Sequence, residues 1–65
     1  MCLSTVYLNG KNGQTKVMGD VAHIEAEDTG YWLIDLFGER RFVEGRIHTV
    51  NLMDGCLVML PPEEN

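Results

Sequence analysis

The first two residues of the chain, Met1 and Cys2, carry the groups best suited to bind a metal ion. With Met1 retained, its α-amine, the amide nitrogen of Cys2 and the Cys2 thiolate can close two fused chelate rings around one ion. Thiolate and deprotonated amide donors suit square-planar Ni(II) or Cu(II), whereas structural zinc prefers closed tetrahedral sites with more Cys or His ligands. The amine and the thiol must lose protons to bind, so binding should weaken in acid. A fourth donor would come from the Cys2 of a second subunit, a backbone group or water.

A cysteine at position two also has a simpler interpretation, as a small apolar residue that opens a strand. The second cysteine, Cys56, follows the turn Asp54-Gly55 and opens an apolar segment, so we expect it to fill the core. The two cysteines form no CxxC pair, which leaves a zinc finger or a thioredoxin-like site without support.

The two histidines and the acidic residues show no pattern typical of a metal or catalytic site. His23 and His48 lie in expected strands, without HxH or HExxH spacing, and we expect surface or interface positions for both. Glu25, Glu27 and Asp28 form an acidic cluster at a turn, but they lack the spacing of an EF-hand loop and indicate a solvated turn. No nucleophile elbow, phosphate-binding loop or dinucleotide fingerprint occurs, so we expect no enzymatic activity.

Three arginines, Arg40, Arg41 and Arg46, form the only basic cluster and suggest a contact surface for RNA or protein. Nucleic-acid binding rests on Lys and Arg pairing with phosphates, yet the chain has ten acids against five bases, a formal charge of −5. Nucleic acid is therefore a disfavoured partner, and pairing of the arginines with nearby glutamates is the simpler explanation. We expect Tyr31 and Trp32 to pack in the core or at a dimer interface rather than stack on a ligand.

With 65 residues the chain makes one domain, and 45% apolar residues suffice for a core. It shows no signal peptide and no run of about 20 apolar residues that could span a membrane. We therefore expect a cytoplasmic protein with no membrane association. In that reducing compartment Cys2 and Cys56 should be thiols, and a disulfide between them would require an exported form.

Turn residues at short intervals separate segments rich in Val, Ile, Leu, Tyr, Trp and Thr, a pattern that favours strands. No stretch has sustained helical periodicity, so the fold class is all-β. Apolar residues on both faces of several strands predict a core on one face and a partner subunit on the other. The expected strands are Cys2–Leu8, Thr15–Glu25, Tyr31–Phe37, Arg41–Leu52 and Cys56–Leu60.

Two glycines inside expected strands, Gly19 and Gly45, predict a bulge or a sharp bend at each position. Such bends let a five-stranded sheet curl and close. We therefore predict a small, strongly bent, five-stranded antiparallel barrel of the SH3-like or Sm-like kind over residues 1–60. An open β-meander is the alternative. Residues 61–65, with two prolines and two acids, are expected to form a flexible acidic tail.

Short motifs spread over nearly the whole chain resemble one known family. Each motif alone is unspecific, but their order and spacing, together with the chain length, resemble the CooT family, small proteins linked to nickel insertion into carbon monoxide dehydrogenase. The motifs are Met1-Cys2-Leu3-Ser4-Thr5-Val6-Tyr7-Leu8, Gly19-Asp20-Val21, Asp35-Leu36-Phe37-Gly38-Glu39, Gly45-Arg46-Ile47 and Val50-Asn51-Leu52-Met53-Asp54-Gly55.

The resemblance implies a homodimeric Sm/SH3-like barrel that binds Ni(II) through the cysteine directly after the initiator methionine. It thus implies a nickel metallochaperone whose client is carbon monoxide dehydrogenase. Cys2, with Met1 as its amine partner, is the functional residue that carries over. The family is also described as RNA-binding by similarity, which keeps an Sm-like RNA- or protein-binding module without metal chemistry as the alternative function. Cys56 is a departure from the family motif.

Overall fold

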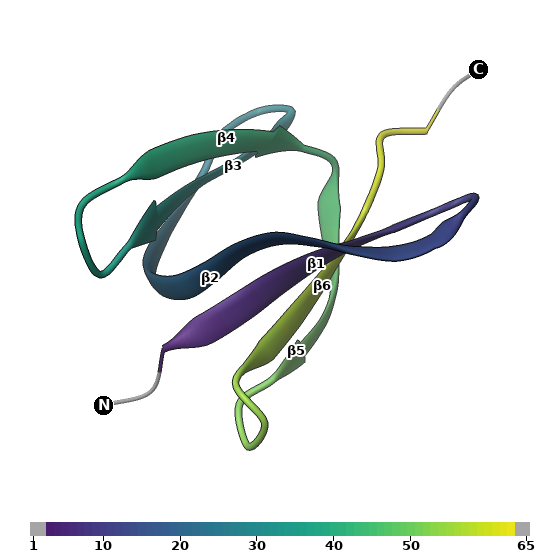
Figure 1. Cartoon of the computed structure of the whole chain (residues 1–65). Helices are drawn as coiled ribbons and strands as arrows, with labels where there is room; N and C mark the ends of the chain where they lie inside the picture. Colours follow the sequence, from purple (N-terminus) through teal and green to yellow (C-terminus); the bar gives the residue numbers. More distant parts are fainter. Residues whose placement is uncertain (1–2, 64–65) are drawn as a thin grey trace.

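The computed structural model describes residues 3–63, which form one mixed sheet of six strands (Figure 1). The order across the sheet is β4-β3-β2-β1-β6-β5. No helix that could cross a membrane occurs in this part of the chain. The strands are β1 (Ser4–Gly10), β2 (Gly13–Ala26), β3 (Gly30–Asp35), β4 (Arg40–Glu44), β5 (Arg46–Asn51) and β6 (Cys56–Leu60).

The all-β class is confirmed, but the predicted five-stranded antiparallel barrel is wrong in three respects. The expected strand Arg41–Leu52 is two strands, β4 and β5, so there are six. The sheet is mixed, because β1 and β6 pair in parallel, with Thr5 beside Cys56 and Leu8 beside Met59. It is not closed, because β4 and β5 form its two edges and do not pair with each other.

Gly45 separates β4 from β5 and carries the chain from one edge of the sheet to the other. Its φ of 127° lies in a region that side chains with a Cβ rarely adopt. A Cβ at this position would stand 2.1 Å from the carbonyl oxygen of Leu60. The Gly45 amide also donates to the carbonyl oxygen of Thr29, at 3.0 Å. The bend predicted at Gly45 is therefore confirmed, and the approach of Leu60 explains why no side chain fits there.

The bend predicted at Gly19 is also confirmed, as a bulge in the long strand β2. The register of β1 against β2 shifts between the pairs Ser4–Val21 and Val6–Met18, so β2 has one residue more than β1 in this interval. Asp20, rather than Gly19, takes the positive φ, at 53°. Such a bulge increases the local bend and twist, and here it turns β2 around the core.

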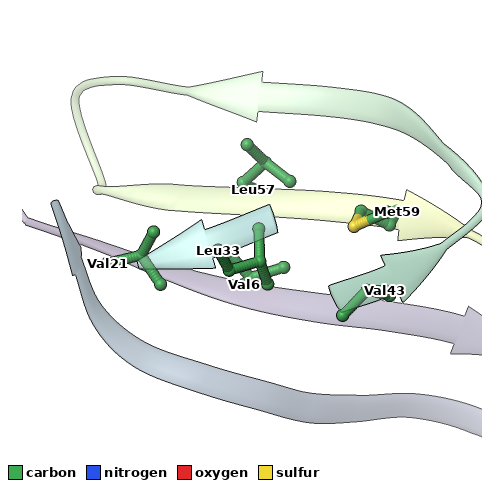
Figure 2. Close-up of a cluster of buried hydrophobic side chains, with 6 residues drawn as sticks. All are labelled: Val6, Val21, Leu33, Val43, Leu57 and Met59. Carbon is green, nitrogen blue, oxygen red and sulfur yellow. The ribbon is translucent and has the colours of Figure 1, made fainter. Parts of the chain in front are cut away.

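The core lies on the concave face of the bent sheet and draws on five of the six strands (Figure 2). Val6, Leu33 and Met59 are fully buried. Strand alternation directs their neighbours to the opposite face, where Trp32 and Phe42 pack edge to face with ring centroids 5.2 Å apart. Trp32 is thus half-buried outside the core, whereas Tyr31 packs against it. The full set of core residues is Val6, Val21, Leu33, Val43, Leu57 and Met59.

Replacing Gly45 with alanine should destabilise the protein by at least about 3 kcal/mol, because positive-φ strain adds to a clash with the Leu60 backbone. Gly13→Ala is the matched control, since Gly13 also has a positive φ (101°) but no heavy atom within 4 Å of the added Cβ. Urea unfolding of both variants measures the difference. Equal losses of stability would show that the Leu60 contact does not constrain the bend.

Candidate metal site at the start of the chain

The predicted metal ligands, Met1 and Cys2, lie outside the described residues, and the described chain begins at the half-buried Leu3. The next residue, Ser4, opens β1, which has β2 on one side and β6 on the other. The chain therefore enters the middle of the sheet directly after the candidate site. The Thr5 amide donates to the carbonyl oxygen of Gly55 at 2.8 Å, which fixes the start of β1 against the turn before β6.

Strand register brings two turns to the same end of the sheet as the start of β1. Asp35, the last residue of β3, pairs with Val21, which pairs with Ser4. On the other side Thr5 pairs with Cys56, which pairs with the last residue of β5. The β3–β4 turn and the β5–β6 turn consequently flank the start of β1 (Figure 1).

These two turns carry large apolar side chains that nothing in residues 3–63 covers. Phe37 in the first turn is 80% exposed, and Met53 in the second is 96% exposed. Leu36, Val50 and Leu52 are also exposed. We call these five residues the apolar rim. The sequence pattern placed Phe37 at the end of an expected strand and Met53 between two expected strands, and it predicted no exposed surface there. The missed indication was an apolar residue inside a turn, where no strand neighbour can bury it.

Asp35 shapes the first of these turns and has no sign of a separate chemical role. Its Oδ1 accepts hydrogen bonds from the amides of Phe37 and Glu39, each at 2.9 Å. The Leu36 amide donates to the carbonyl oxygen of Asp20 at 2.9 Å, so the bulge in β2 holds the same turn. Both sides of the turn are thus tied, and the exposed Phe37 is presented on a fixed backbone.

Cys56 opens β6 and is half-buried, but it is not part of the core, so that prediction is wrong. The reason is strand alternation: Leu57 and Met59 face the core, and Cys56 therefore faces the opposite side of the sheet. Its Sγ has one polar contact, with the carbonyl oxygen of Asp54 at 3.7 Å. Cys56 is the single cysteine in residues 3–63. Its strand partner is Thr5, so it lies near the start of β1.

The three arginines of the alternative function do not form one surface. Arg40 lies over Trp32, 5.0 Å from the ring centroid. Arg41, its neighbour in β4, points to the other face, where its Nη1 donates to the carbonyl oxygen of Val17 at 3.1 Å. Arg46 begins β5 and pairs through Nη1 with Glu63 at 3.2 Å. The structure thus gives each arginine a different local partner, although Arg40 and Arg41 both line the hollow between β2 and the β3–β4 turn.

The histidines are exposed and do not converge on a site. His23 Nε2 lies 3.0 Å from Glu25 Oε2, on the outer side of β2. His48 falls at the register shift of β5 against β6, between Ile47 and Thr49. Across residues 3–63 no group of three or more His, Cys, Asp or Glu side chains is arranged to hold a metal ion. The predicted ligands Met1 and Cys2 lie outside these residues.

The described chain is a small all-β protein built on one bent, mixed sheet of six strands. Its sequence places a candidate metal ligand, Cys2, two residues before the first strand. The sequence model of the CooT family, described as CO dehydrogenase accessory protein CooT, matches residues 1–59, and the chain belongs to this family. The resemblance seen in the sequence is thereby confirmed. The description makes it a family of CO dehydrogenase accessory proteins.

A solved structure shares the fold. The crystal structure of the "putative CooT from Carboxydothermus hydrogenoformans" superposes with a TM-score of 0.87 at 16% sequence identity, covering 95% of this chain and 100% of that chain. At this identity the likeness shows the fold alone. No curated protein matches the sequence.

Gly55 packs closely against the backbone of Leu3, at the start of the described chain. Its φ is 66°, and an added Cβ would stand 3.0 Å from the carbonyl oxygen of Leu3. Gly55→Ala should therefore cost about 1 kcal/mol more than Gly38→Ala, because Gly38 has a similar φ (86°) but no heavy atom within 4 Å of the added Cβ. Thermal unfolding of the two variants compares them. Equal destabilisation would mean that Leu3 moves aside freely.

Proposed function

We propose that this CO dehydrogenase accessory protein binds Ni(II) at the start of its chain and supports delivery of nickel to the enzyme in the cytoplasm. The observation that carries the proposal is Cys2 directly after Met1, in a family match that begins at residue 1. The ligands are the Met1 α-amine, the Cys2 amide nitrogen and the Cys2 thiolate, a donor set suited to square-planar Ni(II).

The location of the site suits a metal that is carried and then released. All three donors belong to two consecutive residues, so a competing protein can approach the ion without unfolding the sheet. The described chain from Leu3 onward is held by neighbours on both sides, which gives the short terminal segment a firm base. Thiolate donors hold the ion as long as they stay deprotonated and reduced, conditions that the cytoplasm supplies.

Titration of the tag-free protein with Ni(II), followed by thiolate-to-nickel absorption, tests the proposal. Cys2→Ser removes the thiolate and should lower the affinity by about a hundredfold or more, since the thiolate is the strongest donor of the set. Ser4→Ala is the control, because it changes a nearby polar side chain and leaves every proposed donor in place. Unchanged binding by Cys2→Ser would rule the nickel site out.

The amine donor has its own control within the same titration. One or two extra residues ahead of Met1 remove the α-amine from its chelate ring and should weaken binding, although both thiols remain. Intact mass of the protein reports whether Met1 is retained. If Met1 is removed, Cys2 itself supplies the amine and binds with its thiolate as a two-donor site of different geometry.

We further propose that the protein acts as a homodimer whose subunits meet at the apolar rim. Three side chains of the rim are more than three-quarters exposed, Phe37 at 80%, Leu52 at 76% and Met53 at 96%, and exposed apolar surface of this kind is typical of a protein–protein interface. The rim flanks the start of β1, so a twofold interface there brings two chain starts near each other. No other exposed apolar side chains of comparable size occur in residues 3–63.

Replacing Phe37 and Met53 together with serine should dissociate the dimer, with each substitution weakening association by about tenfold or more. Phe37→Leu is the control, because it keeps an apolar side chain at that point of the rim. Sedimentation velocity over a concentration series measures the mass. A double variant that stays dimeric would place the interface elsewhere.

A further inference from the structure

We propose that Asn12 is a site of spontaneous deamidation in the folded protein, and that the fold protects Asn9 from the same reaction. Both asparagines precede a glycine, Gly13 and Gly10 respectively. A glycine has no Cβ to shield its amide nitrogen, which makes Asn-Gly pairs prone to this modification. The two pairs lie in one hairpin, so their surroundings in the structure distinguish them. The proposal does not depend on the nickel site.

The reaction needs only water as a co-reactant. The Gly13 amide nitrogen loses its proton to solvent base and attacks the side-chain carbonyl carbon of Asn12, so that a C–N bond closes a five-membered succinimide ring. The bond from that carbon to Nδ2 breaks, and the nitrogen leaves as ammonia with a proton from solvent. Water then opens the ring at either carbonyl and gives isoaspartate or aspartate. The rate rises with pH, because the attacking nitrogen must be deprotonated.

Asn12 lies where the backbone can rotate to close this ring. Lys11 and Asn12 form the two-residue loop between β1 and β2, beyond the closing pair Gly10–Gly13, and all four residues are exposed. Gly13 has a φ of 101° and no heavy atom within 4 Å of where a Cβ would be, so its neighbours leave space around it. Glycine also adopts other φ values at little cost. Rotation of the Asn12–Gly13 peptide therefore disturbs only the closing pair of the hairpin.

Asn9 belongs to the same hairpin but is held more firmly. It is half-buried in β1 and pairs with Gln14 of β2. Its Oδ1 accepts a hydrogen bond from Gln14 Nε2 at 3.1 Å. Attack by the Gly10 nitrogen would break this hydrogen bond and rotate Asn9 out of the strand pairing, and both raise the barrier. We therefore expect Asn12 to react about tenfold or more faster than Asn9.

The modification changes both charge and backbone at the tip of the hairpin. Each event replaces a neutral amide with a carboxylate and takes the formal charge from −5 to −6. Isoaspartate also adds one carbon to the backbone of a two-residue loop, and the pair that closes the loop must adjust. Lys11 lines a hollow together with Pro61 and Pro62, so the altered tip faces the segment after β6.

The modified tip is remote from the candidate metal site. β1 runs from Ser4 near the chain start to Gly10 at the tip, so the tip lies at the opposite end of this strand (Figure 1). Deamidation should therefore leave the chain start and the apolar rim unaltered.

Trypsin makes the test direct, because it cleaves after Lys11 and places the two asparagines on different peptides. Tag-free protein is incubated in mildly alkaline buffer while circular dichroism verifies that it stays folded, and samples are digested over time. Residues 12–16 should gain the mass of an amide-to-acid change about tenfold or more faster than residues 1–11. Fragmentation assigns the gain to Asn12 rather than Gln14, and an isoaspartate-specific methyltransferase should label the same peptide.

Two controls separate the effect of the fold from that of the sequence. In urea both asparagines should react at similar rates, since both precede glycine. Gln14→Ala removes the hydrogen bond to Asn9 and should raise the rate at Asn9, while the rate at Asn12 stays the same. Equal rates at the two asparagines in the folded protein would overturn the proposal, and so would a preference for Asn12 that persists in urea.

Discussion

The parallel ladder between β1 and β6 is the interaction on which the rest of the structure depends. Within residues 3–63, it is the strand pairing by which the β5–β6 hairpin joins the sheet formed by β1 to β4. A two-stranded hairpin alone is marginally stable in water. Without this ladder Leu57 and Met59 would leave the core, and Val6 and Leu33 would lose the side chains that cover them. The bend at Gly45 makes this ladder possible. It lets the chain cross from β4 at one edge of the sheet to β5 at the other, so that β6 can pair with β1.

The ladder also determines which segments lie together at the end of the sheet where β1 starts. Because β1 is a central strand, the first described residues are held from both sides, and the two flanking turns come to the same end. Asp35 ties one turn and Asn51 with Asp54 ties the other. Side-chain hydrogen bonds therefore hold both turns at the end of the sheet where β1 starts, and apolar side chains remain uncovered at the same end. Order of the backbone combined with exposed apolar surface is typical of a surface built to be covered by another molecule.

Much of the secondary structure could be predicted from the sequence, because it depends on local chemistry. The segment Cys56–Leu60 coincides with β6, and the glycine bends near Gly19 and at Gly45 are where the pattern placed them. The parallel pairing could not be predicted, since residues about fifty positions apart leave no local trace of their contact, and the short turns between consecutive strands suggested an antiparallel barrel. The same lack of a local signal for strand pairing explains why Cys56 was wrongly predicted to lie in the core. Its apolar neighbours indicated burial, but the face of a strand that meets the core is decided by the strand beside it. Met1 and Cys2, conversely, could be assigned as candidates from sequence because their donors are contiguous.

The order of synthesis sets when the β1–β6 ladder can form. β1 is made first and β6 last, so at about 5–20 residues per second the beginning of the chain waits about 3–10 s for its partner strand. During that time the leading residues are open to the enzymes that trim nascent chains. Any trimming of the first methionine therefore takes place on an unfinished polypeptide, before β6 exists to pair with β1.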